Sequence, residues 1–286
     1  AGVKIAHVGH LVQPPEAMME HLVRTIQPEV ITIYSYEKAK SLSAWCEKYQ
    51  YTQNIMLKFY DENDHLYINQ EAGFKIEDIE KVVKTISTLP YIKISGVTHF
   101  PCYLSNGDQV IPTHNLNSLI KAKNYFLEHE VDCTFVNAPS MTCCATLAIS
   151  SSMGCTHCEP GHALTGTIPI NAKGTQPEKV AMLYLSEISH HYDGHSYCFG
   201  GGYYRRGYLT QALVNGQLIN VTNNDTDSID YHLKLDGIHP VGTAAIMAFR
   251  SQIFTTRSRV ALIEGLSTGA PALKGVYTST GAHIHG

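Results

Sequence analysis

The segment CTHCEPGHALTG, residues 155–166, places two cysteines, two histidines and a glutamate within twelve residues. Cysteine and histidine are the usual ligands of zinc, so a metal site is one interpretation. A Pro-Gly turn followed by free backbone amides suits, instead, the phosphate of an organic cofactor. The two interpretations lead to different functions for the whole chain.

A zinc site needs more than the single CxxC pair of this segment. Structural zinc sites use two paired ligand sets, such as a second CxxC or an HxxxH. Cys155 follows a helix-ending glycine, and we predict a strand at residues 155–164. Residues three apart on a strand, such as Cys155 and Cys158, point to opposite faces. We therefore expect no metal site and assign the cysteines as buried free thiols.

The elements that must position this segment alternate along the first part of the chain. Short apolar runs alternate with amphipathic stretches, which is typical of a parallel sheet with helical crossovers. Strands are predicted at residues 3–11, 30–35, 54–60, 91–100, 133–140 and 155–164. Helices are predicted at residues 14–26, 37–48, 76–89, 116–129 and 141–153. This gives six strands, whereas a closed (β/α)8 barrel needs eight, so we expect either an open sheet or two βα units that precede Ala1.

The pattern changes after about residue 169. Residues 180–191, 211–222, 231–235 and 241–265 are rich in Ile, Val, Leu, Tyr and Thr and are separated by turn signals such as NNDTD. This composition indicates antiparallel β structure. The sequence therefore predicts a second, mainly β domain after a boundary near residues 171–176.

The composition excludes several classes of function. The chain has 286 residues, a formal net charge of −4 and no basic run, which argues against nucleic acid or an anionic membrane surface as the main partner. No apolar run reaches membrane-spanning length, and no signal peptide is visible. The eight cysteines are scattered through a long chain, which indicates reduced thiols in the cytoplasm. We expect a small-molecule substrate.

Four motifs carry a resemblance to a known family. They are GVTHFP at residues 96–101, VNAPSMTC at 136–143, CEPGHALTG at 158–166 and YCFGGGYYRRG at 197–207. Together they resemble the YhfX-like branch of the alanine-racemase-like, fold type III pyridoxal-phosphate proteins, and the similarity extends over nearly the whole chain.

The resemblance implies a fold and an assembly. It implies a (β/α)8 TIM-type barrel at residues 1–172 that binds pyridoxal 5′-phosphate, followed by a mainly antiparallel β domain at residues 173–286. It also implies a homodimer with a shared active site. We expect the first two βα units of the barrel, and the lysine that carries the cofactor covalently, to precede Ala1. Lys58 matches instead a lysine with a supporting role.

The resemblance assigns cofactor contacts to residues at the strand ends. His99 matches a histidine beside the pyridine ring, and a core histidine bonded to backbone is the alternative. The phosphate is assigned to Ser140 and to the amides near Gly161 and His162, with Asn137 on the same strand end. Hydroxyl and amide donors suit a dianion.

Glu159 departs from alanine racemases, which have an arginine at the matching position. Related amino-acid decarboxylases have a glutamate there, in an EPGR run. A carboxylate facing the ring nitrogen favours its protonated form and stabilises negative charge at the substrate α-carbon. His162 replaces the arginine of that EPGR run, so the reaction type stays open. A solvated loop carboxylate is the alternative for Glu159.

A second acid or base is expected in the β domain. The YCFGGGYYRRG run resembles a stretch that contains a catalytic tyrosine in alanine racemases, with a register ambiguous by a residue or two. The candidates are Tyr203, Tyr204, Cys198 and Arg205. A tyrosine suits proton transfer, and an arginine suits the substrate carboxylate.

The sequence thus predicts a pyridoxal-phosphate isomerase that racemises or epimerises an amino acid. Decarboxylation or aldol chemistry on the same fold is the first alternative. A non-catalytic protein that binds or carries the cofactor is the second.

Overall fold

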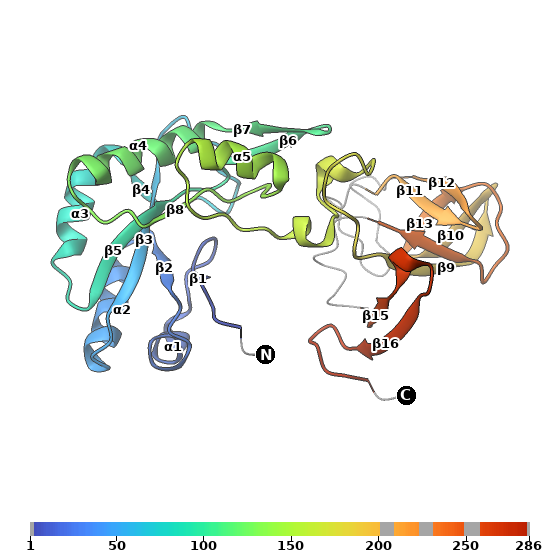
Figure 1. Cartoon of the computed structure of the whole chain (residues 1–286), viewed down its shortest axis with the longest axis horizontal. Helices are drawn as coiled ribbons and strands as arrows, with labels where there is room; N and C mark the ends of the chain where they lie inside the picture. Colours follow the sequence, from blue (N-terminus) through green and yellow to red (C-terminus); the bar gives the residue numbers. More distant parts are fainter. Residues whose placement is uncertain (1–2, 201–208, 223–230, 249–257, 285–286) are drawn as a thin grey trace. The chain divides into compact units, whose positions relative to one another are not determined.

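The computed structural model describes residues 3–200, 209–222, 231–248 and 258–284 (Figure 1). The chain divides into two compact units, Ala1–Pro160 and Gly161–Gly286, and each unit has its own apolar core. The expected domain limits, residues 1–172 and 173–286, stay a prediction, because a unit defined by packing need not end where a domain ends.

A parallel sheet with strand order β1-β2-β3-β5-β8 forms the centre of the first unit. A further short strand, β4, pairs with β3, also in parallel. The strands are β1 (His7–Val8), β2 (Val30–Ile33), β3 (Gln53–Tyr60), β4 (Phe74–Lys75), β5 (Ile92–Thr98) and β8 (Phe135–Asn137). All of β2 and most of β3 are buried, which is the pattern of parallel strands covered on both faces.

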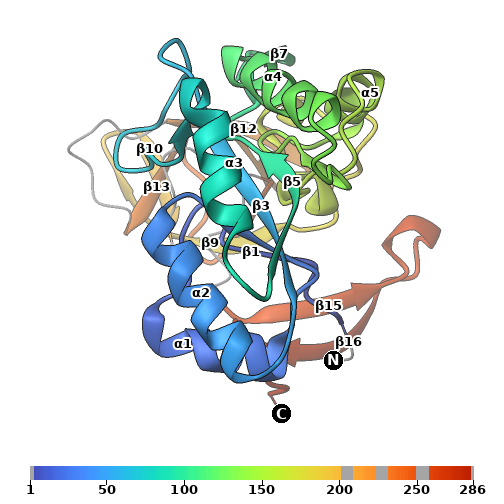
Figure 2. The same cartoon turned by 90° about the vertical axis from the view of Figure 1, so that its left-hand side faces the viewer.

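Helices follow the strands along the chain. They are α1 (Glu16–His21), α2 (Tyr36–Lys48), α3 (Ile79–Ser87), α4 (His114–Glu128) and α5 (Cys144–Ser152). The contacts of α2, α3 and α4 run to β3 or β5, and Figure 2 shows α2 and α3 in front of the sheet. The buried residues of α3 are spaced three or four apart, as on a helix face directed at a core.

Two predicted elements near the start of the chain take a different form. The strand expected at residues 3–11 is reduced to β1, because Gly9 has a left-handed φ of 89° that ends the extended run. The helix expected at residues 14–26 is α1 followed by a π-helical turn at Leu22–Ile26. A hairpin of β6 (Tyr103–Asn106) and β7 (Gln109–Pro112) was not predicted.

The strand predicted at residues 155–164 is wrong. The segment makes one isolated parallel bridge, between His157 and Asn137 of β8, and no longer ladder within the part of the chain that the structure describes. Pro160 lacks an amide hydrogen, and Gly161 follows it, so the sequence beyond the bridge does not favour continued pairing.

The second unit contains a closed antiparallel barrel with strand order β10-β13-β12-β11-β14-β9. Its strands are β9 (Tyr184–Tyr192), β10 (His195–Phe199), β11 (Gln211–Val214), β12 (Gln217–Thr222), β13 (His232–Asp236) and β14 (Ala244–Met247). A separate ribbon pairs β15 (Val260–Glu264) with β16 (Ala272–Tyr277). The predicted order of a parallel αβ part followed by an antiparallel β part is confirmed.

Candidate active site

Polar residues gather at the carboxyl ends of the parallel strands. Lys58 on β3, Thr98 on β5 and Asn137 on β8 lie in one row of the strand register. Neighbours in such a row project from the same face of a sheet, and all three side chains are buried. In α/β folds this edge of the sheet is where ligands bind.

Glu159 is held at this edge by groups from β1 and β8. Its Oε1 atom accepts hydrogen bonds from His7 Nδ1 at 2.9 Å and from Asn137 Nδ2 at 2.7 Å. His10 Nδ1 lies 3.6 Å from the same oxygen. The other oxygen, Oε2, has no hydrogen bond to the described residues, so it is open to a ligand. The strand-end cluster consists of His7, His10, Lys58, His99, Asn137 and Glu159.

The surroundings keep Glu159 ionised. Burial by itself would raise its pKa, but the hydrogen bonds from His7 and Asn137 and the nearby His10 outweigh burial and hold the pKa below its usual value. Burial is also the main reason that the pKa of His10 falls from 6.5 to about 4. At pH 7 the cluster therefore presents a carboxylate beside a neutral imidazole.

His99 lies directly after β5 and binds a carboxylate rather than backbone. Its Nε2 atom is 2.6 Å from Asp64 Oδ2, and neither side chain has exposed surface. The second Asp64 oxygen, Oδ1, accepts hydrogen bonds from His114 Nδ1 at 2.9 Å and from Ser118 Oγ at 2.8 Å. These bonds and the His99 contact lower the pKa of Asp64 despite its burial.

Lys58 brings an amine into the same row. Its Nζ atom lies 5.7 Å from the centre of the Tyr34 ring, within the range of a cation–π contact. Burial lowers the pKa of this amine, because removal from water disfavours the charged form.

Three buried polar atoms of the strand-end cluster have no hydrogen-bond partner among the described residues. They are His10 Nδ1, His99 Nδ1 and Asn137 Oδ1. Buried polar atoms are nearly always satisfied by protein, water or ligand. Three such atoms beside an ionised carboxylate fit a polar ligand with several donor groups, as pyridoxal phosphate with an amino acid would be.

Ser140 lies where β8 turns toward α5. Its hydroxyl donates to the carbonyl of Tyr103 at 2.7 Å, and both Ser140 and Met141 have left-handed φ values, of 85° and 47°. Gly161 and His162, the other predicted phosphate contacts, begin the second compact unit. The assignment of these residues to a phosphate stays a prediction.

Of the four catalytic candidates predicted in the β domain, the structure describes one, Cys198. Cys198 is fully buried in the core of the antiparallel barrel, and burial raises the pKa of its thiol. The assignment of Cys198 as a catalytic group stays a prediction. Tyr203, Tyr204 and Arg205 lie outside the described residues.

The cysteines of the opening motif are free thiols. Cys155 and Cys158 are partly buried and form no disulfide. They do not lie on a strand, so the argument that they point to opposite strand faces no longer applies. In the described ranges of the chain, no three His, Cys, Asp or Glu side chains are placed to hold a metal ion.

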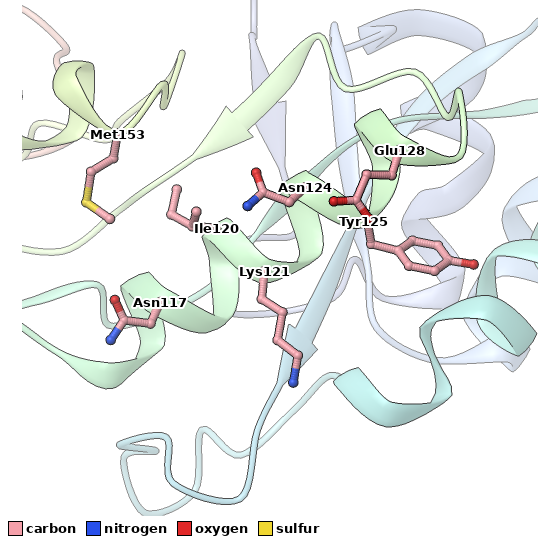
Figure 3. Close-up of a pocket in the computed structure, with 7 residues that line it drawn as sticks. All are labelled: Asn117, Ile120, Lys121, Asn124, Tyr125, Glu128 and Met153. Carbon is pink, nitrogen blue, oxygen red and sulfur yellow. The ribbon is translucent and has the colours of Figure 1, made fainter.

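A surface hollow of about 510 Å³ lies along α4 and is open to solvent. Figure 3 shows the side chains that line it on α4, together with Met153. They are Asn117, Ile120, Lys121, Asn124, Tyr125, Glu128 and Met153. None of these residues belongs to the strand-end cluster, and none was predicted as a site residue.

Sequence patterns missed three functional candidates, His7, His10 and Asp64. His7 and His10 form an HxxH pattern near a predicted strand, and this pattern was a usable signal. Asp64 lies in a loop with two other acidic residues, Asp61 and Glu62. Nothing in one sequence separates Asp64 from these neighbours, because its role depends on a contact 35 residues away.

None of the helices in the described part of the chain combines the length and apolar character that a membrane-spanning helix requires.

Comparison with known proteins gives two family matches. Residues 4–169 match the alanine racemase N-terminal domain, and residues 183–273 match the YhfX-like C-terminal domain. The Escherichia coli (strain K12) protein YhfX is 46% identical over 289 aligned residues, which cover 98% of this chain and 74% of that protein.

Solved structures with low sequence identity share the fold. D-threonine aldolase from Filomicrobium marinum has a TM-score of 0.66 and 9% identity, over 96% of this chain and 76% of that chain. D-threo-3-hydroxyaspartate dehydratase from Delftia sp. HT23 has a TM-score of 0.63 and 13% identity, over 96% and 77%. Alanine racemase from Clostridium difficile 630, in complex with cycloserine, has a TM-score of 0.57 and 16% identity, over 90% and 69%. The likeness confirms the predicted fold class, a TIM-type barrel part followed by an antiparallel β domain.

Proposed function

Because this chain belongs to the YhfX-like family of proteins with an alanine racemase N-terminal domain, we propose that it is a pyridoxal 5′-phosphate enzyme acting at the α-carbon of an amino acid. Racemisation or epimerisation is the favoured reaction. The substrate is a small-molecule amino acid, and the proposal includes a homodimer in the cytoplasm.

The observation that carries this proposal is the environment of Glu159. Its Oε1 atom is fixed by His7 and Asn137, its Oε2 atom has no hydrogen bond to the described residues, and its pKa is lowered. An ionised carboxylate with one fixed and one available oxygen is suited to accept a hydrogen bond from a protonated ring nitrogen. A solvated loop glutamate would have none of these contacts.

The other predicted site residues are assigned to the ring and the phosphate of the cofactor. His99 and Asn137 would lie beside the ring, and Ser140, Gly161 and His162 would hold the phosphate. When bound, pyridoxal phosphate supplies an electron sink for negative charge at the substrate α-carbon. Glu159 contributes by keeping a proton on the ring nitrogen, and the His7 contact keeps Glu159 in position.

The second acid or base that moves the α-proton is proposed from the 203–205 run. Tyr203 or Tyr204 would transfer the proton through the phenol oxygen, and Arg205 would hold the substrate carboxylate. Cys198 stays a further candidate for the acid or base, and burial of its thiol in the barrel core favours the tyrosines over it.

Decarboxylation or aldol-type chemistry is the second candidate. Glu159 favours it, since the family resemblance places a glutamate at this position in decarboxylases and an arginine in alanine racemases. Two of the structural neighbours are named as an aldolase and a dehydratase, and these names denote reactions other than racemisation. A cofactor carrier without catalytic activity is the third candidate.

Glu159→Gln tests the proposal. The variant keeps the side-chain shape but removes the charge, so cofactor binding is retained while α-proton exchange slows. A lost charge-assisted hydrogen bond in a buried site corresponds to roughly ten- to a hundredfold in rate. The measurement, made on protein that includes the Schiff-base lysine implied by the family resemblance, is deuterium incorporation at the α-carbon of a panel of amino acids in deuterated water, with cofactor binding followed by absorbance.

The matched control is Glu29→Gln, because Glu29 is an exposed glutamate whose partner is Lys4 at 3.1 Å. It should leave the exchange rate unchanged. Equal exchange in the parent and the Glu159 variant would contradict the assigned role of Glu159. Cofactor binding without exchange of any amino acid would favour the carrier, and release of carbon dioxide or an aldehyde would favour the second candidate.

A further inference from the structure

The loop that carries Asp64 is fixed to α4 by paired hydrogen bonds. The fully buried Asn115 accepts from the amide of His65 at 2.9 Å and donates to the carbonyl of His65 at 2.9 Å. Asp64 itself accepts from the Asp61 amide at 2.6 Å. The carboxylate is therefore held in place from both the loop and the helix.

All the donors around Asp64 converge on an ionised carboxylate. His114, Ser118, the Asp61 amide and His99 occupy both oxygens, and the side chain has no exposed surface. Because a carboxylate without its proton is an acceptor only, His99 must supply the hydrogen of the 2.6 Å contact from Nε2. This assigns one proton of the His99 ring.

The other nitrogen of His99 is then an acceptor without a partner. Burial, the largest influence, lowers the pKa of His99, and the contact with Asp64 acts in the opposite direction. With the net pKa lowered, the ring is neutral at pH 7 and Nδ1 bears a lone pair. Nδ1 is buried and has no hydrogen-bond partner in the described ranges. The two ring nitrogens point in divergent directions, so Nδ1 faces away from Asp64.

We propose that Asp64 is a positioning residue that fixes His99 as the tautomer with its proton on Nε2, so that Nδ1 accepts a hydrogen bond from an O–H or N–H group of the bound ligand. The titratable groups around His99 are Asp64, His114 and Lys58, and His10 on the segment after β1 is also close enough to interact with it. None of them satisfies Nδ1 in the structure.

The identity of the donor rests on the proposed function, whereas the tautomer does not. If pyridoxal phosphate and an amino acid occupy the site, the donors are the ring hydroxyl and the substrate ammonium group. The tautomer is a property of the chain before any ligand binds. The two parts of the inference are therefore tested by different measurements.

The tautomer is measured by nitrogen-15 NMR of histidine-labelled protein without ligand at pH 7.5. The chain has 16 histidines, so the His99 signals are assigned by their loss in His99→Gln, which keeps an N–H for Asp64. We expect a protonated Nε2 and an unprotonated Nδ1. A proton on Nδ1, alone or together with Nε2, would overturn the proposal.

Asp64→Asn tests the cause. The asparagine amide offers N–H groups where the carboxylate offered only acceptors, so the proton of His99 should move to Nδ1. The control is Asp61→Asn, which removes a carboxylate from the same loop, one that pairs with Lys121 at 3.6 Å and makes no side-chain bond to His99. It should leave the His99 signals unchanged. An unchanged tautomer in folded Asp64→Asn contradicts the role of Asp64. If that variant fails to fold, the parent spectrum still decides the tautomer.

Binding of pyridoxal 5′-phosphate, alone and with an amino acid, tests the donor. Loss of one buried hydrogen bond predicts roughly tenfold weaker binding for His99→Gln and for Asp64→Asn. Equal affinity in the parent and both variants would show that Nδ1 does not contact the ligand. No binding by the parent protein would contradict the proposed function, while the NMR result would still stand.

Discussion

His10 is surrounded by groups that oppose its protonation. Burial lowers its pKa to about 4, and the nearby His7, Lys58 and His99 act in the same direction, while Glu159 acts against them. In the unfolded chain the same imidazole takes up a proton near pH 6.5. Between these values the unfolded state binds more protons than the folded state, so the free energy of unfolding falls as the pH falls.

His10→Gln should remove this pH dependence. The parent is expected to lose about 2 kcal/mol of unfolding free energy from His10 between pH 7.5 and pH 5, because the unfolded side chain becomes protonated while the folded one stays neutral. Urea unfolding of both proteins at the two pH values measures the difference. If the variant loses as much stability as the parent over this range, His10 is not the group responsible.

At the scale of elements, the approach of β5 to β8 brings the site residues together. Gly96 pairs with Phe135 in the parallel register, two residues before Thr98 and Asn137 pair. A Cβ atom at position 96 would lie 1.9 Å from the carbonyl oxygen of Phe135. The two strands can keep this register only with glycine at this position.

Gly96→Ala should disrupt the β5–β8 pairing. Because the clash involves backbone rather than a flexible side chain, we expect a loss of about 3 kcal/mol or more, or little folded protein. Chemical unfolding and the yield of soluble protein measure the effect. The control is Gly107→Asn, at the tip of the β6–β7 hairpin, where φ is 61° and no atom lies within 4 Å of an added Cβ. Equal stability of the two variants would contradict the close approach.

Sequence patterns predicted the regular elements better than the contacts of the site. The strands β2, β3 and β5 and the helices α2 and α4 were predicted within a few residues, because strands buried on both faces leave continuous apolar runs and amphipathic helices leave a 3.6-residue period. The motif glutamate Glu159 was found through the family resemblance. The Asp64–His99 contact was not, since it joins a loop to a strand end and leaves no local pattern. The strand expected at residues 155–164 was wrong because Pro160 and Gly161 do not favour pairing beyond the single bridge at His157.

At the scale of the whole molecule, each of the two compact units has its own apolar core. We therefore expect the two units to unfold in separate transitions. The chain has a single tryptophan, Trp45, and it lies on α2 in the first unit, stacked on Tyr49. Its fluorescence therefore reports on the first unit. Circular dichroism reports on both units, including the antiparallel barrel.

Leu235→Ala should separate the two signals. Leu235 is fully buried in the barrel core, and its truncation is expected to cost about 2–5 kcal/mol in the second unit. The urea midpoint from circular dichroism should fall while that from Trp45 fluorescence stays in place. Leu57→Ala on β3, in the other core, should lower the fluorescence midpoint. A joint shift of both signals in Leu235→Ala would show that the two units unfold as one.

The two left-handed residues at the end of β8, Ser140 and Met141, bear on how this chain responds to selection. Each such residue costs about 1–2 kcal/mol relative to an unstrained conformation, and glycine would relieve that cost. A library selected for heat resistance alone would therefore accumulate glycine at these positions and discard the serine hydroxyl. A library selected for ligand binding would retain the hydroxyl if Ser140 contacts the phosphate. The divergence of the two libraries at position 140 would reveal whether the strained turn is maintained for function or is only tolerated.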